Sequence, residues 1–461
     1  MAKKPHRHAP RRGLNRYDRR LVRSLSRSNV ETTLSGLRGF INRSRWLGST
    51  NRYSNDTIAK IKSDSKARRI REPKHLAQYI SASCLLHCSD GWSYLGKAIL
   101  SLLRGDPHRA RHLAYYAELR AAVSLLATEG IGIFNNKHFI VDAPDSVARM
   151  HGGAESTTHL FAWACLDYWA SRRRSGELFA DVVKPYGRSL QEWMAPLGGA
   201  STVAPQAREW FRQWGMDLKK LPEDREARNN SSYQPDGIPD LWPTNAAETL
   251  AFVRQVWSAF EPSSASRFEV IDRHILRIAL HSAFKGRTGK SAADDPSQFS
   301  SFVAQIIDNQ AFPPKVRRQW LNFVTRQIDP IDLEVFRLSQ QSPETRHDSE
   351  LAIVSRAALL LRFATGSISQ LLTAASFSGQ TIEFWWKHIG QERGLWDGAK
   401  TVNELLDLWA DISSSLEGIQ EFQQQNSPES QTFFRIGSEL ANAVVAMANC
   451  ELVAIWSIAP E

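Results

Sequence analysis

The sequence predicts a mostly α-helical fold, in which a basic N-terminal arm precedes a helical bundle domain with one small hairpin and a second all-helical domain. Apolar residues recur at helical spacing along most of the 461 residues, whereas one short segment has the pattern of paired strands. Hydrophobic residues make up 42% of the chain and charged residues 23%. A sizeable core can therefore form, and wholesale disorder, collagen-like and disulfide-framework classes are excluded.

Three parts are predicted along the chain: residues 1–72 as the basic arm, 73–260 as a helical domain and 261–461 as a C-terminal helical domain. The first boundary lies where the excess of basic residues ends. The second lies at the start of the polar run Glu261–Ser266, whose proline, serine and alanine residues are typical of a linker.

The predicted elements follow one another from the hydrophobic spacing. An apolar stripe from Tyr116 to Leu126 predicts a helix that stops at Gly130. Segments 131–134 and 137–141 flank two asparagines and have the pattern of a hairpin. A helix is then expected from Thr157 to Arg174, because its basic end suits a helix C-terminus.

The C-terminal part contains further helical patterns, and the segment 351–364 is hydrophobic nearly all round, which predicts a buried helix. The helices expected in this part cover residues 271–284, 302–307, 316–328, 351–364, 405–419 and 433–458.

Charge is distributed unevenly along the chain. Residues 1–72 contain 20 Lys and Arg against five Asp and Glu, a net charge of +15, whereas the whole chain is +10. The remainder is thus −5, and the basic excess is confined to the arm.

Such a local basic excess is typical of proteins that contact nucleic acid, because binding releases the counterions of the phosphates. The alternative is a solvated, partly disordered tail that aids solubility or docks on an acidic partner protein. The arginines expected to contact RNA or DNA are Arg11, Arg12, Arg16, Arg19, Arg20, Arg23, Arg68, Arg69 and Arg71.

No membrane span, metal site or cofactor is predicted. The most apolar segment, 440–458, is interrupted by two asparagines and a glutamate, and Met1–Arg27 lacks the apolar core of a signal peptide. A cytoplasmic location is therefore expected. Cys84, His87 and Cys88 form a C-x-x-H-C pattern, but no second pair of ligands follows at the spacing that zinc requires.

A polar segment, residues 225–235, is the sequence's main candidate for a catalytic site. If its helix continues, Arg228 shares a face with Ser232, and Asn229 shares a face with Tyr233. Arginine can hold a phosphate with two hydrogen bonds, and the amide and hydroxyl groups can assist. The structural alternative is a hydrogen-bond network that fixes the junction between a helix and a loop.

Four short pieces of the chain resemble HEPN domains, all-α proteins common among prokaryotic toxins and phage-defence ribonucleases, and the YaaC-like branch of such proteins. The resemblance covers about residues 75–260. It implies a helical bundle that often dimerises, with its motif near the dimer cleft. The pieces are Tyr94–Ala98, Leu113–Leu119, His151-Gly152 and Arg228-Asn229 followed by Tyr233.

The resemblance implies that Arg228 contacts the phosphate, with Asn229 and Tyr233 in support. The family has a histidine where this chain has Tyr233, and an unperturbed tyrosine, with a pKa near ~10, is a poor general base. His151 is the candidate for carrying the proton in its place.

The sequence therefore predicts a nucleic-acid-associated binding or sensing component of a bacterial defence or stress system. One alternative is a metal-independent endoribonuclease that uses Arg228, Asn229, Tyr233 and His151. A second alternative is a protein–protein scaffold with a basic docking arm. The expected partners are RNA or DNA, a second copy of the chain and a partner protein of a defence system.

Overall fold

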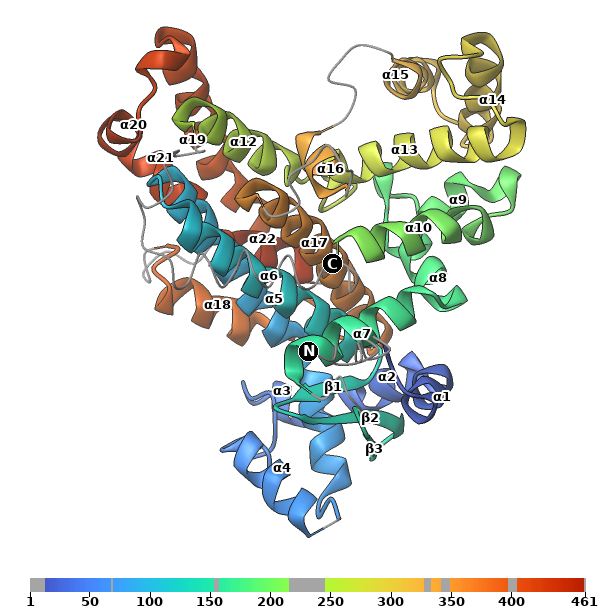
Figure 1. Ribbon diagram of the computed structural model, residues 1–461, viewed down its shortest axis with the longest axis vertical. Coiled ribbons are helices and arrows are strands. Elements are labelled where there is room, and N and C mark those ends of the chain that lie inside the picture. Colours follow the sequence, from blue (N-terminus) through green and yellow to red (C-terminus); the bar gives the residue numbers. More distant parts are fainter. Residues whose placement is uncertain are drawn as a thin grey trace, which may run out of the picture.

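The computed structural model describes residues 13–67, 69–152, 157–214, 245–326, 333–340, 349–396 and 404–459 (Figure 1). The prediction of a mostly α-helical protein is confirmed, since one small antiparallel sheet accompanies the helices over these ranges. The predicted boundaries at residues 72 and 260 stay predictions. The main hydrophobic core runs across both positions, from Leu14 to Ala459.

The described part of the N-terminal arm is helical and packed. Val22, Val30, Leu34 and Ile41 are all buried in the main core. Residues 13–67 are therefore not a solvated tail, although Arg23 and Arg38, which lie between these buried positions, are exposed. The helices of the arm are α1 (Arg16–Ser24), α2 (Arg27–Ser35), α3 (Arg38–Ile41) and α4 (Thr57–Lys66).

A long helical hairpin forms the centre of the molecule. Helix α5 (Pro73–Leu103) and helix α6 (Pro107–Thr128) pack along each other, and Asp106 caps the second helix by accepting a hydrogen bond from the N–H of Arg109. Helix α17 (Glu350–Ala374) packs against both (Figure 1). This three-helix unit joins segments that are more than two hundred residues apart.

The predicted hairpin is present and is part of a three-stranded antiparallel meander. Strand β1 (Ile131–Phe134) pairs with β2 (Lys137–Ala143), with Ile131 opposite Ile140. The third strand, β3 (Ser146–Met150), was not predicted, because its sequence lacks clear apolar alternation. The sheet packs on the N-terminal half of α5, and α1 and α2 lie beside it (Figure 1).

One segment that was predicted to be a single helix forms two helices. The helix expected from Thr157 to Arg174 ends at Ala170, and Arg172 has an extended backbone before the next helix begins. The hydroxyl of Ser175 donates to the carbonyl of Ala170 at 2.9 Å. The Ser175 hydroxyl therefore satisfies a carbonyl at the end of α7, which would accept a backbone N–H if the helix continued. The two helices are α7 (Thr158–Ala170) and α8 (Arg173–Val182).

The single helix predicted over residues 433–458 is divided into three helices, α20 (Phe433–Glu439), α21 (Ala441–Met447) and α22 (Glu451–Ile458). The break before α22 packs on α5 at Gly96, where a Cβ atom would collide with the carbonyl oxygen of Ala448. Close approach of two backbones thus explains both the glycine and the interruption.

The remaining helices cover the central unit, and the other predicted segments lie within or largely within them. They are α9 (Leu190–Trp193), α10 (Ala200–Trp214), α12 (Ala246–Ala259), α13 (Glu269–Thr288), α14 (Pro296–Asp308), α15 (Pro314–Thr325), α16 (Glu334–Ser339), α18 (Glu383–Glu392) and α19 (Leu408–Gln425).

Helix α17 is the most enclosed helix of the centre. In the described ranges it is the one helix that by itself is long and apolar enough to cross a membrane, but 89% of its most apolar window is buried inside the protein. The bent pair α21 and α22 passes the same test together, with an angle of 48° between its halves. Such extensive burial within the protein is typical of a core helix.

Charged residues on α17 are buried with partners from distant segments. The Nε of Arg356 donates to Glu118 of α6 at 2.9 Å. Arg362 donates through Nε and Nη2 to Asp272 of α13, at 2.8 and 2.6 Å, and its Nη2 also reaches the carbonyl of Val182 at 2.9 Å. A buried guanidinium requires such partners, so these pairs specify where α6, α8 and α13 lie.

We expect Asp272→Ala to lower the free energy of unfolding by about 3–5 kcal/mol, because it leaves the buried charge of Arg362 without its carboxylate. Chemical denaturation followed by circular dichroism measures the change. The matched variant Asp308→Ala removes an exposed ion pair with Arg317 and should have little effect. An equally small loss of unfolding free energy in both variants would show that the buried Arg362–Asp272 pair contributes no more than an exposed ion pair.

Candidate nucleic-acid interface

Helix α1 presents four arginines on one exposed face. Asn15 caps the helix by accepting a hydrogen bond from the N–H of Asp18 at 2.8 Å, and Val22 packs into the core. The spacing of the remaining positions brings a row of guanidinium groups to the solvent side. These exposed arginines are Arg16, Arg19, Arg20 and Arg23.

The opposite face of α1 is anchored by a buried carboxylate. Asp18 is completely buried and accepts hydrogen bonds from the backbone N–H groups of His151 at 2.8 Å and Gly152 at 2.9 Å. The side-chain amide of Asn15 donates a third, at 2.6 Å. Because the carboxylate is held from both sides, α1 is fixed to the end of β3.

Aromatic rings lie among these arginines. The rings of Tyr17 and His151 stack with their centroids 4.4 Å apart and their planes 19° apart, and both residues are exposed. The guanidinium of Arg19 lies 5.6 Å from the ring centroid of Tyr168, and Arg23 Nε donates to the Tyr168 hydroxyl at 2.7 Å. Tyr168 thereby connects α1 to the end of α7.

A cleft of about 860 Å³ opens beyond Tyr168, between the ends of α7 and α8 and one side of α10. Four arginines line the cleft together with two acidic residues, Glu177 and Glu209, so basic side chains outnumber acidic ones. Arg212 pairs with Asp167, next to Tyr168, at 2.9 Å. The basic residues that line the cleft are Arg172, Arg173, Arg208 and Arg212.

Together these groups form one basic and aromatic surface over α1, α7, α8 and α10, helices that lie next to one another in Figure 1. We call it the arginine surface. It consists of Arg16, Tyr17, Arg19, Arg20, Arg23, His151, Tyr168, Arg172, Arg173, Arg208 and Arg212.

The predicted site residues fall into three groups. Arg16, Arg19, Arg20, Arg23 and His151 belong to the arginine surface. Arg69 and Arg71 follow α4 and are exposed, but no contact described here joins them to α1. Arg11, Arg12, Arg68, Arg228, Asn229 and Tyr233 lie outside the described residues.

Sequence reasoning missed the part of the surface contributed by α7, α8 and α10. Arg172 and Arg173 were interpreted as the basic end of one helix, whereas they lie at the junction of two. Arg208 and Arg212 are four residues apart and share a helix face, a signal that the sequence does contain.

Two other basic residues near this surface are structural. Arg27 of α2 is buried, and its Nη1 donates to the hydroxyl of Ser367 at 2.8 Å and lies 3.4 Å from Glu129. Arg174 contacts the other oxygen of Glu129 at 2.8 Å. Burial lowers the pKa of Arg27, against the carboxylate of Glu129, which favours its charged form.

Asp64 holds the segment of the arm that carries Arg71. Its buried carboxylate accepts hydrogen bonds from the Tyr53 hydroxyl at 2.6 Å, from Arg52 at 2.9 Å and from the N–H of Arg71 at 3.3 Å. Burial acts to raise the pKa of Asp64, but these hydrogen bonds outweigh it and hold the pKa below the usual range.

The cysteines contribute no visible metal centre. Cys84 and Cys88 are buried, and burial raises the pKa of each thiol to about 12. The Sγ of Cys88 lies 3.3 Å from the hydroxyl of Thr365 on α17. Across the described ranges, no group of three or more His, Cys, Asp or Glu side chains is placed to hold a metal ion.

Comparisons of the chain with protein-family models, curated proteins and solved structures found no match. The HEPN-like and YaaC-like resemblance therefore stays a prediction of the sequence. The functional argument rests on the surface itself.

We expect Asp18→Ala to accelerate hydrogen exchange at the amides of His151 and Gly152 by about tenfold or more, because it removes two charge-assisted hydrogen bonds. Exchange followed by mass spectrometry measures this. Asp411→Ala, which removes an exposed carboxylate on α19, is the matched control. Unchanged protection in the Asp18 variant would mean that α1 is not anchored through this carboxylate.

We expect the stabilisation by Asp64 to depend on pH. Since its pKa is lower in the folded than in the unfolded protein, the stabilisation is complete above the unfolded value of about 3.9 and is lost as the pH falls through the folded value. Asp64→Asn should lower the melting temperature at pH 7, with a difference that shrinks below about pH 4. A difference that is constant with pH would contradict the assignment.

Proposed function

We propose that the protein binds nucleic acid through the arginine surface and acts as a binding or sensing component. The observation that carries the proposal is the exposed row of four arginines on a helix whose other face is fixed by Asp18. A row of arginines on a fixed helix can contact several phosphates without the backbone first being ordered, which reduces the entropy lost on binding.

The spacing of the row suits a chain of phosphates. Residues four apart on a helix are separated by about 6 Å along its axis, so Arg16, Arg20 and Arg23 span roughly 10 Å. A single compact anion would meet only one or two of these groups. A polyanion can meet all of them and continue towards the cleft between α8 and α10.

The aromatic rings favour a single-stranded nucleic acid over an acidic protein. Tyr17 is 44% exposed and already stacks on His151, which is the geometry in which a base could extend the stack. Base stacking on aromatic side chains contributes about 1–3 kcal/mol per base and does not depend on sequence. An acidic protein partner would have no comparable use for this ring pair.

The endoribonuclease alternative has less support. Of its four candidate residues, the described residues include only His151, whose ring stacks on Tyr17. Arg228, Asn229 and Tyr233 lie outside the described residues. The link to a defence or stress system, dimerisation and the cytoplasmic location all stay predictions, as does the scaffold alternative.

We expect replacement of Arg16, Arg19, Arg20 and Arg23 by alanine to weaken the binding of single-stranded RNA or DNA and to reduce its salt dependence. For single strands, each lost phosphate contact lowers the slope of log K against log salt by about 0.7, or by about 3 for four contacts. Fluorescence anisotropy with a labelled oligonucleotide at several salt concentrations measures both quantities.

The control changes the net charge equally, by replacing Lys285, Arg287, Lys315 and Arg318, all of which are exposed and lie away from α1 in the sequence. Equal weakening in both variants would attribute binding to overall charge. Failure of the wild-type protein to bind any oligonucleotide would contradict the proposal. Tyr17→Ala should weaken binding without changing the salt slope, because it removes stacking and no charge.

A further inference from the structure

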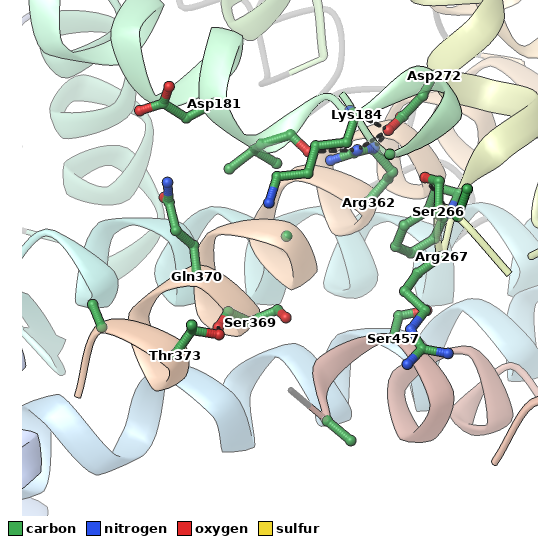
Figure 2. A pocket seen from close by; sticks show the side chains of 17 residues that line it. Asp181, Lys184, Ser266, Arg267, Asp272, Arg362, Ser369, Gln370, Thr373 and Ser457 are labelled. Atoms are coloured by element: carbon green, nitrogen blue, oxygen red, sulfur yellow. Dashed lines mark hydrogen bonds and ion pairs between the residues drawn. The ribbon is translucent and has the colours of Figure 1, made fainter. Parts of the chain in front are cut away.

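A second, smaller cavity lies on the described part of the protein, away from the arginine row on α1. It has a volume of about 530 Å³ and is bounded by the end of α8, the start of α13, the C-terminal half of α17 and the end of α22 (Figure 2). This volume is within the range of sites for small metabolites, about 300–1,000 Å³. The lining side chains are mostly polar, and several are charged.

The buried Arg362–Asp272 pair forms one wall of this cavity. Arg362 is only 2% exposed, and its Nε and Nη2 are satisfied as described above. Its Nη1 has no hydrogen-bond partner among the described residues. The neighbouring wall residue is Gly366, where a Cβ atom would collide with the side chain of Val182 and lie 3.0 Å from this Nη1, so the glycine lets α17 pack closely against the end of α8.

A second buried donor lacks a partner at the other side. Ser457, near the end of α22, is 2% exposed, and no hydrogen bond reaches its Oγ from the parts of the chain that the structure describes. Buried polar atoms are nearly always hydrogen-bonded in folded proteins. Two such donors line this cavity, and a bound ligand with acceptor oxygens can pair with them.

Two cationic side chains accompany these donors. In Figure 2, Lys184 extends its ammonium group towards the cavity, and Arg267 lies beside Ser457. With Arg362 they supply three positive charges, against the two carboxylates of Asp181 and Asp272. The positive side chains border the cavity from Lys184 across Arg362 to Arg267, an arrangement that suits an anionic group.

The cavity also carries acceptors for hydroxyl groups. In Figure 2, Asp181 and Gln370 lie on the same side of the cavity as the ammonium of Lys184, and Ser369 and Thr373 lie near Gln370 on α17. Burial raises the pKa of Asp181, while the nearby charge of Lys184 acts in the opposite direction. A carboxylate accepts hydrogen bonds and an amide both donates and accepts them, so together they can pair with the hydroxyls of a sugar.

We propose that this cavity binds a small phosphorylated ligand that also carries sugar hydroxyls. Its phosphate contacts Lys184 and Arg267 and takes up the unpaired donors of Arg362 and Ser457. Its hydroxyls contact Asp181 and Gln370. Ribose phosphate is the chemistry that a free pentose phosphate and a mononucleotide share, and the experiment distinguishes these two sources.

Isothermal titration of the intact protein with ribose 5-phosphate, AMP, adenosine and inorganic phosphate tests the proposal. Ribose 5-phosphate or AMP should bind at least tenfold more tightly than adenosine and inorganic phosphate. Similar affinity for ribose 5-phosphate and AMP would identify a pentose phosphate, and tighter binding of AMP would identify a nucleotide. No binding of either compound, or equal binding of adenosine, would overturn the proposal.

Variants locate the site. Lys184→Ala and Arg267→Met should each weaken binding by about tenfold or more, whereas Lys315→Ala, an exposed lysine on α15, should have no effect. Asp181→Asn should weaken the binding of ribose 5-phosphate and leave that of inorganic phosphate unchanged. Wild-type affinity in both cationic variants would overturn the assignment. The melting temperature of each variant shows that it is folded.

The inference is separable from the proposed nucleic-acid function. The variant that lacks the four arginines of α1 should bind ribose 5-phosphate or AMP as the wild-type protein does. Lys184→Ala should bind oligonucleotides normally. Loss of ligand binding in the four-arginine variant would place the ligand on the arginine surface and contradict a separate cavity site.

Discussion

The burial of charged and polar side chains on helix α17 is the constraint on which the rest of the structure depends. A guanidinium that leaves water must meet a carboxylate or carbonyl with correct geometry, because an unpaired buried charge is very unfavourable. Arg362 meets Asp272 and the carbonyl of Val182. Ser367, five residues along the helix from Arg362, accepts a hydrogen bond from the buried Arg27 of the arm. One helix thereby fixes the positions of α2, α8 and α13.

Both proposed sites depend on these buried contacts of α17 and of the helices around it. Arg27 ties α2 to α17, and Asp18 ties α1 to the end of β3, so the exposed arginines of α1 stand on a fixed support. The cavity beside α17 is bounded by Arg362, which Asp272 holds in place, and by Gly366, which lets α17 pack closely against Val182. A rigidly supported surface loses less conformational entropy on binding, because it does not have to become ordered first.

The sequence predicted the helical class and the hairpin because these depend on local spacing, but it did not predict the elements that depend on distant contacts. The third strand and the breaks at Arg172 and before α22 arise from tertiary packing. The basic excess of the arm includes the exposed arginines of α1. Charge counting could not separate exposed Arg23 from buried Arg27, because the difference lies in partners more than a hundred residues away.

The most direct test of the account maps the contact itself. Single-stranded RNA carrying photoreactive 4-thiouridine is irradiated with the intact protein, and the cross-linked residues are identified by mass spectrometry. The account predicts cross-links at Tyr17, His151 or Tyr168, the aromatic residues of the arginine surface. Cross-links confined to segments that do not belong to this surface, with none at these three residues, would contradict it.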